Sequence, residues 1–166
     1  MEQALDPNNA AGYLDRGLCC YNQGDYPRAL EWYYKALAVR EKAPGEEGPG
    51  IAVIYDSIAA VYDKQENYPR ALEWYHKALA VREKALGEGH LDTAMTCNNI
   101  GLVYNKQGDS LRALEWYQRS FTGDEQAPGE GDLGTAVTDD NLAEVLSKVA
   151  KAAQAALEKL KEATES

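Results

Sequence analysis

The residues that most resemble a chemical motif are Gly129, Gly131 and Gly134, whose GxGxxG spacing matches the phosphate-binding loop of dinucleotide-binding proteins. That loop functions when it follows a β-strand and turns its backbone amides toward a pyrophosphate. Here it follows a segment with helical spacing, and Glu130 and Asp132 place carboxylates where phosphates would lie. We therefore expect no nucleotide cofactor.

Histidine and cysteine are the next residue types that could perform chemistry, and they are few. The histidines are His76 and His90, and the cysteines are Cys19, Cys20 and Cys97. No spacing among them matches a zinc site, so we interpret His90 as a loop or helix-start residue and the cysteines as small fillers between helices. We expect no metal site and no enzymatic activity, because no pattern of catalytic side chains is present.

The charge of the chain restricts its partners. The formal net charge is -10 at pH 7 and the pI is near 4.7, which makes nucleic acids and anionic membranes poor partners. The odd number of cysteines and the lack of a secretory leader lead us to expect a cytoplasmic protein. No apolar run approaches the roughly 18 residues that span a bilayer.

An internal repeat defines the elements that would position any functional residue. The string ALEWY occurs at 29–33, 71–75 and 113–117, and each copy follows the last by 42 residues. Apolar residues recur at helical spacing in two blocks per copy, with a turn between them, which predicts two antiparallel helices. We divide this single domain into a stub at 1–8, repeats at 9–50, 51–92 and 93–134, and a tail at 135–166.

Small residues explain how the two helices of each repeat pack. A small residue recurs at one position of the first helix, and a tyrosine recurs at one position of the second helix. The small residue lets the helix axes approach, and the tyrosine ring fills the space beside it. The pairs are Gly17 with Tyr33, Ala59 with Tyr75, and Gly101 with Tyr117.

These residues carry a family resemblance. Gly101-x-x-Tyr104 and Ala113-x-x-x-Tyr117 resemble the tetratricopeptide repeat signature, and the 42-residue spacing resembles the kinesin light chain type of that repeat. The resemblance covers about residues 9–146 and implies an all-α fold, a right-handed solenoid of antiparallel helix hairpins. Cys20 stands where the first repeat should have a tyrosine. The heptad segment by which kinesin light chains join the motor is absent, so a motor-subunit role is not implied.

The tail differs in composition from the repeats. It contains no glycine or proline, and its apolar residues alternate spacings of four and three, which predicts one long helix with 147–151 as the place where a break would fall. We interpret it as a cap for the end of the stack, and we expect a monomer. A coiled-coil dimer contact is the alternative. The apolar positions are Leu142, Leu146, Val149, Ala153, Ala156 and Leu160.

The resemblance also implies a binding surface, because the first helix of each tetratricopeptide repeat lines the concave side of the stack. The inward positions are rich in amides, which can hold a peptide backbone, and in lysines at equivalent positions. The predicted groove residues are Asp56, Asp63, Lys64, Asn98, Asn99, Leu102, Asn105, Lys106, Asn141 and Lys148.

The predicted function is therefore an adaptor that captures a peptide segment of another protein. A structural or engineered repeat scaffold without a physiological ligand, whose tail serves capping or self-assembly, is the alternative. The acidic tails of chaperones are poor ligands, because the clamps that bind them use basic residues deep in the groove. Lys and Arg are absent from the corresponding positions 53, 56, 57, 95, 98 and 99.

Overall fold

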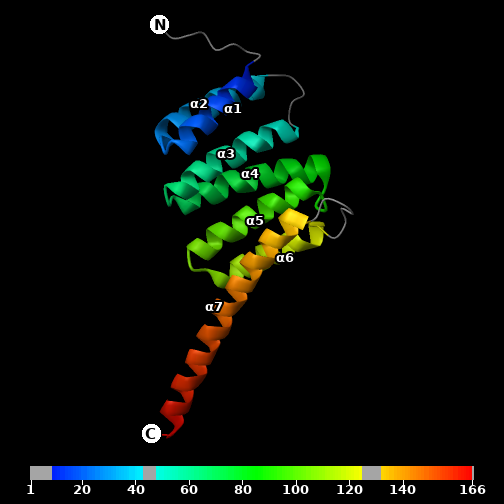
Figure 1. The fold of residues 1–166 in the computed structure, drawn as a ribbon. Helices are drawn as coiled ribbons and strands as arrows, with labels where there is room; N and C mark the ends of the chain where they lie inside the picture. Colours follow the sequence, from blue (N-terminus) through cyan, green and yellow to red (C-terminus); the bar gives the residue numbers. More distant parts are fainter. Residues whose placement is uncertain (1–8, 43–47, 125–131, 166) are drawn as a thin grey trace. The chain divides into compact units, whose positions relative to one another are not determined.

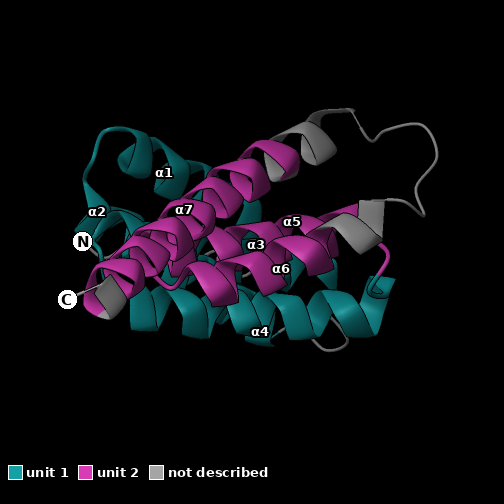
Figure 2. Ribbon diagram, turned by 90° about the horizontal axis from the view of Figure 1, so that it is seen from below, with its two compact units in different colours: residues 1–88 teal, residues 89–166 magenta. Residues whose placement is uncertain are grey.

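A computed structural model describes residues 9–42, 48–124 and 132–165, and every regular element in these ranges is an α-helix. The chain forms two compact units, residues 1–88 and 89–166, which Figure 2 shows in teal and magenta. The all-α prediction is confirmed. The stub at 1–8 lies outside the described residues, as do Gly129 to Gly131 of the glycine motif, whereas Asp132 begins a helix.

The first unit contains two helix hairpins (Figure 1). They are formed by α1 (Ala10–Asn22) with α2 (Tyr26–Lys42), and by α3 (Pro49–Lys64) with α4 (Tyr68–Leu86). Its core is made mainly of fully buried alanine and branched aliphatic side chains. Small side chains let the helices pack closely, and the aliphatic ones supply most of the apolar area removed from water. The fully buried positions include Ala29, Ala36, Ile54, Ile58, Val61 and Ala71.

The second unit contains one hairpin and a long helix (Figure 1). The hairpin pairs α5 (Leu91–Lys106) with α6 (Ser110–Asp124), and α7 (Asp132–Glu165) follows. The predicted tail helix is confirmed, and it continues through 147–151 without a break. The repeat boundaries were placed at 51 and 135, but α3 begins at Pro49 and α7 begins at Asp132. The repeat boundaries therefore stay predictions.

Side-chain caps start the second helix of each hairpin at one equivalent position. The carboxylate of Asp25 accepts a hydrogen bond from the backbone N–H of Arg28 at 3.2 Å, and Asp109 does the same for Arg112 at 3.1 Å. Asn67 caps α4 in the same way. Such caps satisfy backbone donors that have no partner inside the helix.

The predicted small-residue packing is present inside the hairpins. A Cβ atom placed on Gly101 would come within 2.6 Å of the Tyr117 ring, and one on Gly17 would collide with the Tyr33 ring. Ala59 and Tyr117 are both fully buried. The aromatic ring therefore occupies the space that a larger side chain on the first helix would need.

Candidate peptide-binding surface

The predicted groove residues of the first unit lie on α3. Asp56 forms an ion pair with Arg82 of α4, whose side chain is only 9% exposed. Asp63 is half-buried and Lys64 is exposed. Asp56 is therefore part of the contact between α3 and α4, and its charge compensates a buried cation.

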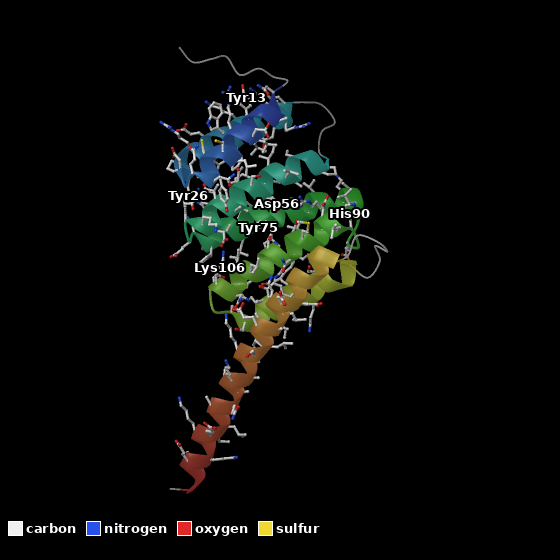
Figure 3. All side chains as sticks on the ribbon, in the orientation of Figure 1. Tyr13, Tyr26, Asp56, Tyr75, His90 and Lys106 are labelled. Atoms are coloured by element: carbon white, nitrogen blue, oxygen red, sulfur yellow. The ribbon has the colours of Figure 1, made fainter. Side chains whose placement is uncertain are left out.

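The hydroxyl of Tyr75 is influenced by Asp56 and Asp63 (Figure 3). Burial raises the pKa of the Tyr75 hydroxyl well above its ordinary value, and the negative charges of Asp63 and Asp56 raise it further. Both carboxylates therefore act on the interior of this hairpin. A ligand at this face would meet a negative potential, with Lys64 as an exposed cation nearby on the same helix.

Four predicted groove residues of the second unit are joined by hydrogen bonds between α5 and α7. The amide nitrogen of Asn141 donates to the side-chain oxygen of Asn98 at 3.2 Å. About two turns of α5 further along, the Lys148 ammonium donates to the side-chain oxygen of Asn105 at 3.1 Å. Four of the ten predicted residues thus form two polar bridges.

Lys148 also forms an ion pair with Glu144 at 2.6 Å. The hydrogen bond from Lys148 lowers the pKa of the Glu144 carboxyl below its ordinary value, and the positive charge of Lys148 and a hydrogen bond with Asn105 lower it further. Lys148 thus connects a carboxylate on its own helix to an amide on α5. The result is an ordered polar surface, because each side chain in it has a partner that fixes its orientation.

The remaining predicted residues of α5 differ in exposure. Asn99 is half-buried, and Lys106, labelled in Figure 3, is exposed. Leu102 is partly buried against a core formed by Ala113, Tyr117 and Val145, so it contributes to packing inside the unit.

Two exposed apolar side chains lie on the same helices but were left out of the predicted site. Val53 of α3 is 46% exposed and Met95 of α5 is 52% exposed. They occupy equivalent positions of successive repeats, and both positions correspond to those that lie deep in the groove of chaperone-binding clamps. The sequence could have indicated these two residues, because both are apolar and they lie 42 residues apart at equivalent positions of the first helix. Met is well suited to contact ligands of varied shape, because its side chain is flexible and polarizable.

The tryptophans of the second helices share a contact that was not predicted. A cation three residues further along the helix covers each ring: Lys35 lies 4.5 Å from the centroid of Trp32, and Lys77 lies 4.1 Å from that of Trp74. Arg119 covers Trp116 in the same way. The signal was the ALEWY string itself, whose tryptophan recurs with a basic residue at a fixed offset.

A polar aromatic cluster in the first unit adjoins Trp74. The hydroxyls of Tyr34 and Tyr62 lie 3.2 Å apart, and Arg70 donates to Tyr62 at 3.1 Å. Burial and the hydrogen bond to Tyr62 raise the pKa of Tyr34 to about 12. The Tyr34 ring also meets Trp74 edge-on, with centroids 5.9 Å apart. These contacts join α2, α3 and α4.

His90 has a structural role in the second unit (Figure 3). It precedes α5, and its Nδ1 accepts a hydrogen bond from the backbone N–H of Asp92 at 3.1 Å. Within the described ranges, no group of three or more His, Cys, Asp or Glu side chains is placed to hold a metal ion. None of the described helices is both long enough and apolar enough to cross a bilayer.

Known proteins resemble this chain in fold and in repeat pattern. No curated protein matches it significantly in sequence. Among solved structures, BtubC (BKLC) from P. vanneervenii is 22% identical with a TM-score of 0.79, and the match covers 98% of this chain and 65% of that one. The chain therefore spans less than two thirds of that protein.

Two further structures extend the comparison. A putative kinesin light chain from Podosopora anserina with nearly identical TPR-like repeats is 17% identical with a TM-score of 0.74, and the match covers 98% of this chain and 75% of that one. The complex of the TPR2AB domain of yeast Sti1 with pHSP90 is 20% identical with a TM-score of 0.69, and covers 89% of this chain and 50% of that one. These likenesses show the fold.

The family follows from the sequence model together with the repeat geometry. The tetratricopeptide repeat model matches residues 9–84, 51–126 and 92–166, which together cover nearly the whole chain. The recurring small residue, tyrosine and helix cap lie in the described hairpins at the positions that the 42-residue period requires. This chain belongs to the tetratricopeptide repeat family.

Proposed function

We propose that this chain is a non-enzymatic adaptor that binds a peptide segment of another protein along its first helices. The tetratricopeptide repeat is a protein-interaction scaffold, and one structural neighbour, Sti1, is in complex with pHSP90. Because a shared fold does not determine a ligand, the surface of this chain has to support the proposal.

The observation that supports it most is the ordered polar surface of α5 and α7. Asn98 with Asn141, and Asn105 with Lys148, are held by hydrogen bonds between the helices. Side chains that are already ordered lose less conformational entropy when a ligand binds. The exposed Met95 on α5 adds an apolar contact beside them.

The chemistry of this surface defines the class of ligand. Amide groups can donate and accept, so they suit the backbone of an extended peptide, and exposed lysines suit a side-chain carbonyl or an isolated carboxylate. We expect an affinity in the roughly micromolar range for an isolated peptide, as is typical of small polar contacts.

The test is a peptide-display screen followed by measured affinities for the selected sequences. For selected peptides that carry an isolated carboxylate, replacing Lys64 and Lys106 by Glu should lower affinity at least about tenfold, equivalent to about 1.4 kcal/mol, while leaving the melting temperature unchanged. Lys151→Glu, an exposed substitution on the second half of α7, serves as the matched control. A screen that returns no shared motif would favour a repeat scaffold without a ligand. Binding that survives the double reversal would contradict the assignment of the surface that binds the peptide.

A further inference from the structure

One face of α7 carries an exposed apolar stripe. Its six residues are spaced alternately by three and four positions, so they lie along one side of the helix. All six are exposed, including Leu146 at 47%, Leu157 at 54% and Leu160 at 65%. The second half of α7 extends away from α5 and α6 (Figure 1). The stripe consists of Ala143, Leu146, Ala150, Ala153, Leu157 and Leu160.

The same face is covered in the preceding hairpin. Ala143 is the repeat equivalent of Gly101, which lies against the buried Tyr117 ring of α6. In the first unit the equivalent residue, Ala59, is also fully buried. Ala143 is exposed, because α7 continues as one helix at the point where α5 ends and turns into α6. The start of α7 thus corresponds to the first helix of a repeat. Among the described residues, no second helix packs over its exposed face.

The second half of α7 resembles that missing helix. The tripeptide ALE at 113–115 of α6 recurs at 156–158, a shift one residue longer than the repeat period. This alignment places Leu160 where α6 has Tyr117, the ring that fills the space beside Gly101. The turn at Gln107–Gly108–Asp109 corresponds to Val149–Ala150–Lys151, which has neither the glycine nor the capping aspartate. Both helices of a hairpin are therefore present in α7 without the turn that would fold one onto the other.

We propose that a second copy of this chain covers the stripe, with the two α7 helices packed antiparallel about a two-fold axis. In the hairpin of α5 and α6, Gly101 lies against Tyr117. If two α7 helices pair in the same register, Ala143 of one copy lies against Leu160 of the other. The same register opposes Leu146 to Leu157 and Ala150 to Ala153. Each pair occurs twice in such a dimer, because a two-fold interface is self-complementary.

The charges on this part of α7 permit self-association. Residues 143–163 contain four lysines and three glutamates, so two copies repel little here although the whole chain carries a net charge of -10. The antiparallel register brings Glu144 of one copy near Lys159 of the other. A parallel pair would instead place each charged residue beside its own equivalent, which is unfavourable.

The first test measures oligomeric state by sedimentation equilibrium at concentrations up to about 1 mM, a range that detects even weak association. The full chain should form dimers, and Leu157→Lys with Leu160→Lys should leave only monomers with an unchanged helical circular dichroism spectrum. Ala155→Lys with Glu162→Lys, on the opposite side of α7, should still dimerise. A wild-type chain that stays monomeric, or a dimer that tolerates the stripe substitutions, overturns the proposal.

The second test measures the register by disulfide cross-linking, in a background without Cys19, Cys20 and Cys97. Ala143→Cys mixed with Leu160→Cys should give a cross-linked heterodimer on mild oxidation, and neither variant alone should cross-link. In the antiparallel register the two copies of residue 160 lie about 26 Å apart along the helix axis, because a helix rises about 1.5 Å per residue. Cross-linking of either single variant would overturn the antiparallel arrangement.

Peptide binding provides an independent readout. The stripe variant carries no change on α3, on α5 or at Asn141 and Lys148, so it should bind a selected peptide with wild-type affinity. Loss of the dimer with retained binding would separate this inference from the proposed adaptor function.

Discussion

Glu66 occupies a backbone conformation that glycine adopts elsewhere in the chain. Its φ angle is 58°, and the equivalent residues of the other hairpin turns are Gly24 at 78° and Gly108 at 82°. A side chain at positive φ crowds the following carbonyl, which costs about 1–2 kcal/mol. The turn between α3 and α4 therefore contains local strain that the packing of the two helices outweighs.

Replacing Glu66 by Gly should stabilise the protein by about 1 kcal/mol, because it removes this crowding at a position where no helix needs the side chain. Urea unfolding of the full chain measures the change as a higher midpoint with the same slope. Gly108→Ala is the matched control, and it should lower stability by a similar amount. Equal midpoints for Glu66→Gly and the wild type would contradict the expectation.

Asp56 is also best understood at the scale of single residues. It was predicted as a groove residue, and in the structure it pairs with the buried Arg82. Asp56→Ala should destabilise the protein by about 3 kcal/mol, because it removes the partner of a buried charge. Thermal unfolding provides the measurement. Lys64→Ala, an exposed change on the same helix, should alter stability by less than about 0.5 kcal/mol.

At the scale of elements, close helix packing is what defines each hairpin. The alanine of the ALEWY string is fully buried in all three copies, at Ala29, Ala71 and Ala113. These residues permit the close approach of the two helices, and the tyrosine four residues later closes the remaining space. Added side-chain volume at one position of either helix should therefore lower the stability of the hairpin.

Enlarging Ala71 to Phe should separate the helices of the second hairpin and lower the free energy of unfolding by about 1–3 kcal/mol. The same substitution at Ala155, which is exposed on α7, should change it by less than about 0.5 kcal/mol. Chemical denaturation of both variants tests the difference. Similar losses for the two would show that burial of Ala71 does not limit the packing.

At the scale of the whole molecule, net charge selects among ligands. With a formal charge of -10, the chain repels anions over most of its surface, and Asp56 and Asp63 add to this on α3. Such long-range effects are screened over about 8–10 Å at physiological salt. Ligand classes should therefore separate by charge and by salt dependence.

Peptide pools sorted by net charge should show this selection. Neutral and basic pools should contain binders, and the affinity of basic binders should fall as salt is raised, because screening weakens their attraction to the acidic surface. Acidic pools should contain none. Fluorescence anisotropy at low and high salt measures the effect, and an acidic pool that binds as well as the neutral one would contradict it.

Much of this architecture could be predicted from local sequence. The 42-residue period located the hairpins, because the residues that pack a first helix on a second recur at fixed spacing. The pairing of Gly101 with Tyr117 was predicted from that period and is confirmed. The start of α7 at Asp132 was not predicted, because the tail was placed at 135–166, after the last glycine of the chain. The groove assignment on α3, α5 and α7 stays a prediction.

The sequence by itself determined the number and kind of hairpins and the family, because helix periodicity, caps and small residues act over a few positions. Only the tertiary structure decided how polar side chains pair across helices: Asp56 with Arg82, Asn98 with Asn141, and Asn105 with Lys148. It also decided which apolar residues of α7 are exposed. The exposed stripe begins at Ala143, whereas the predicted stripe began at Leu142, which is partly buried. Hydrogen bonding and exposure depend on which helix covers which, and the spacing of residues along one helix does not contain that information.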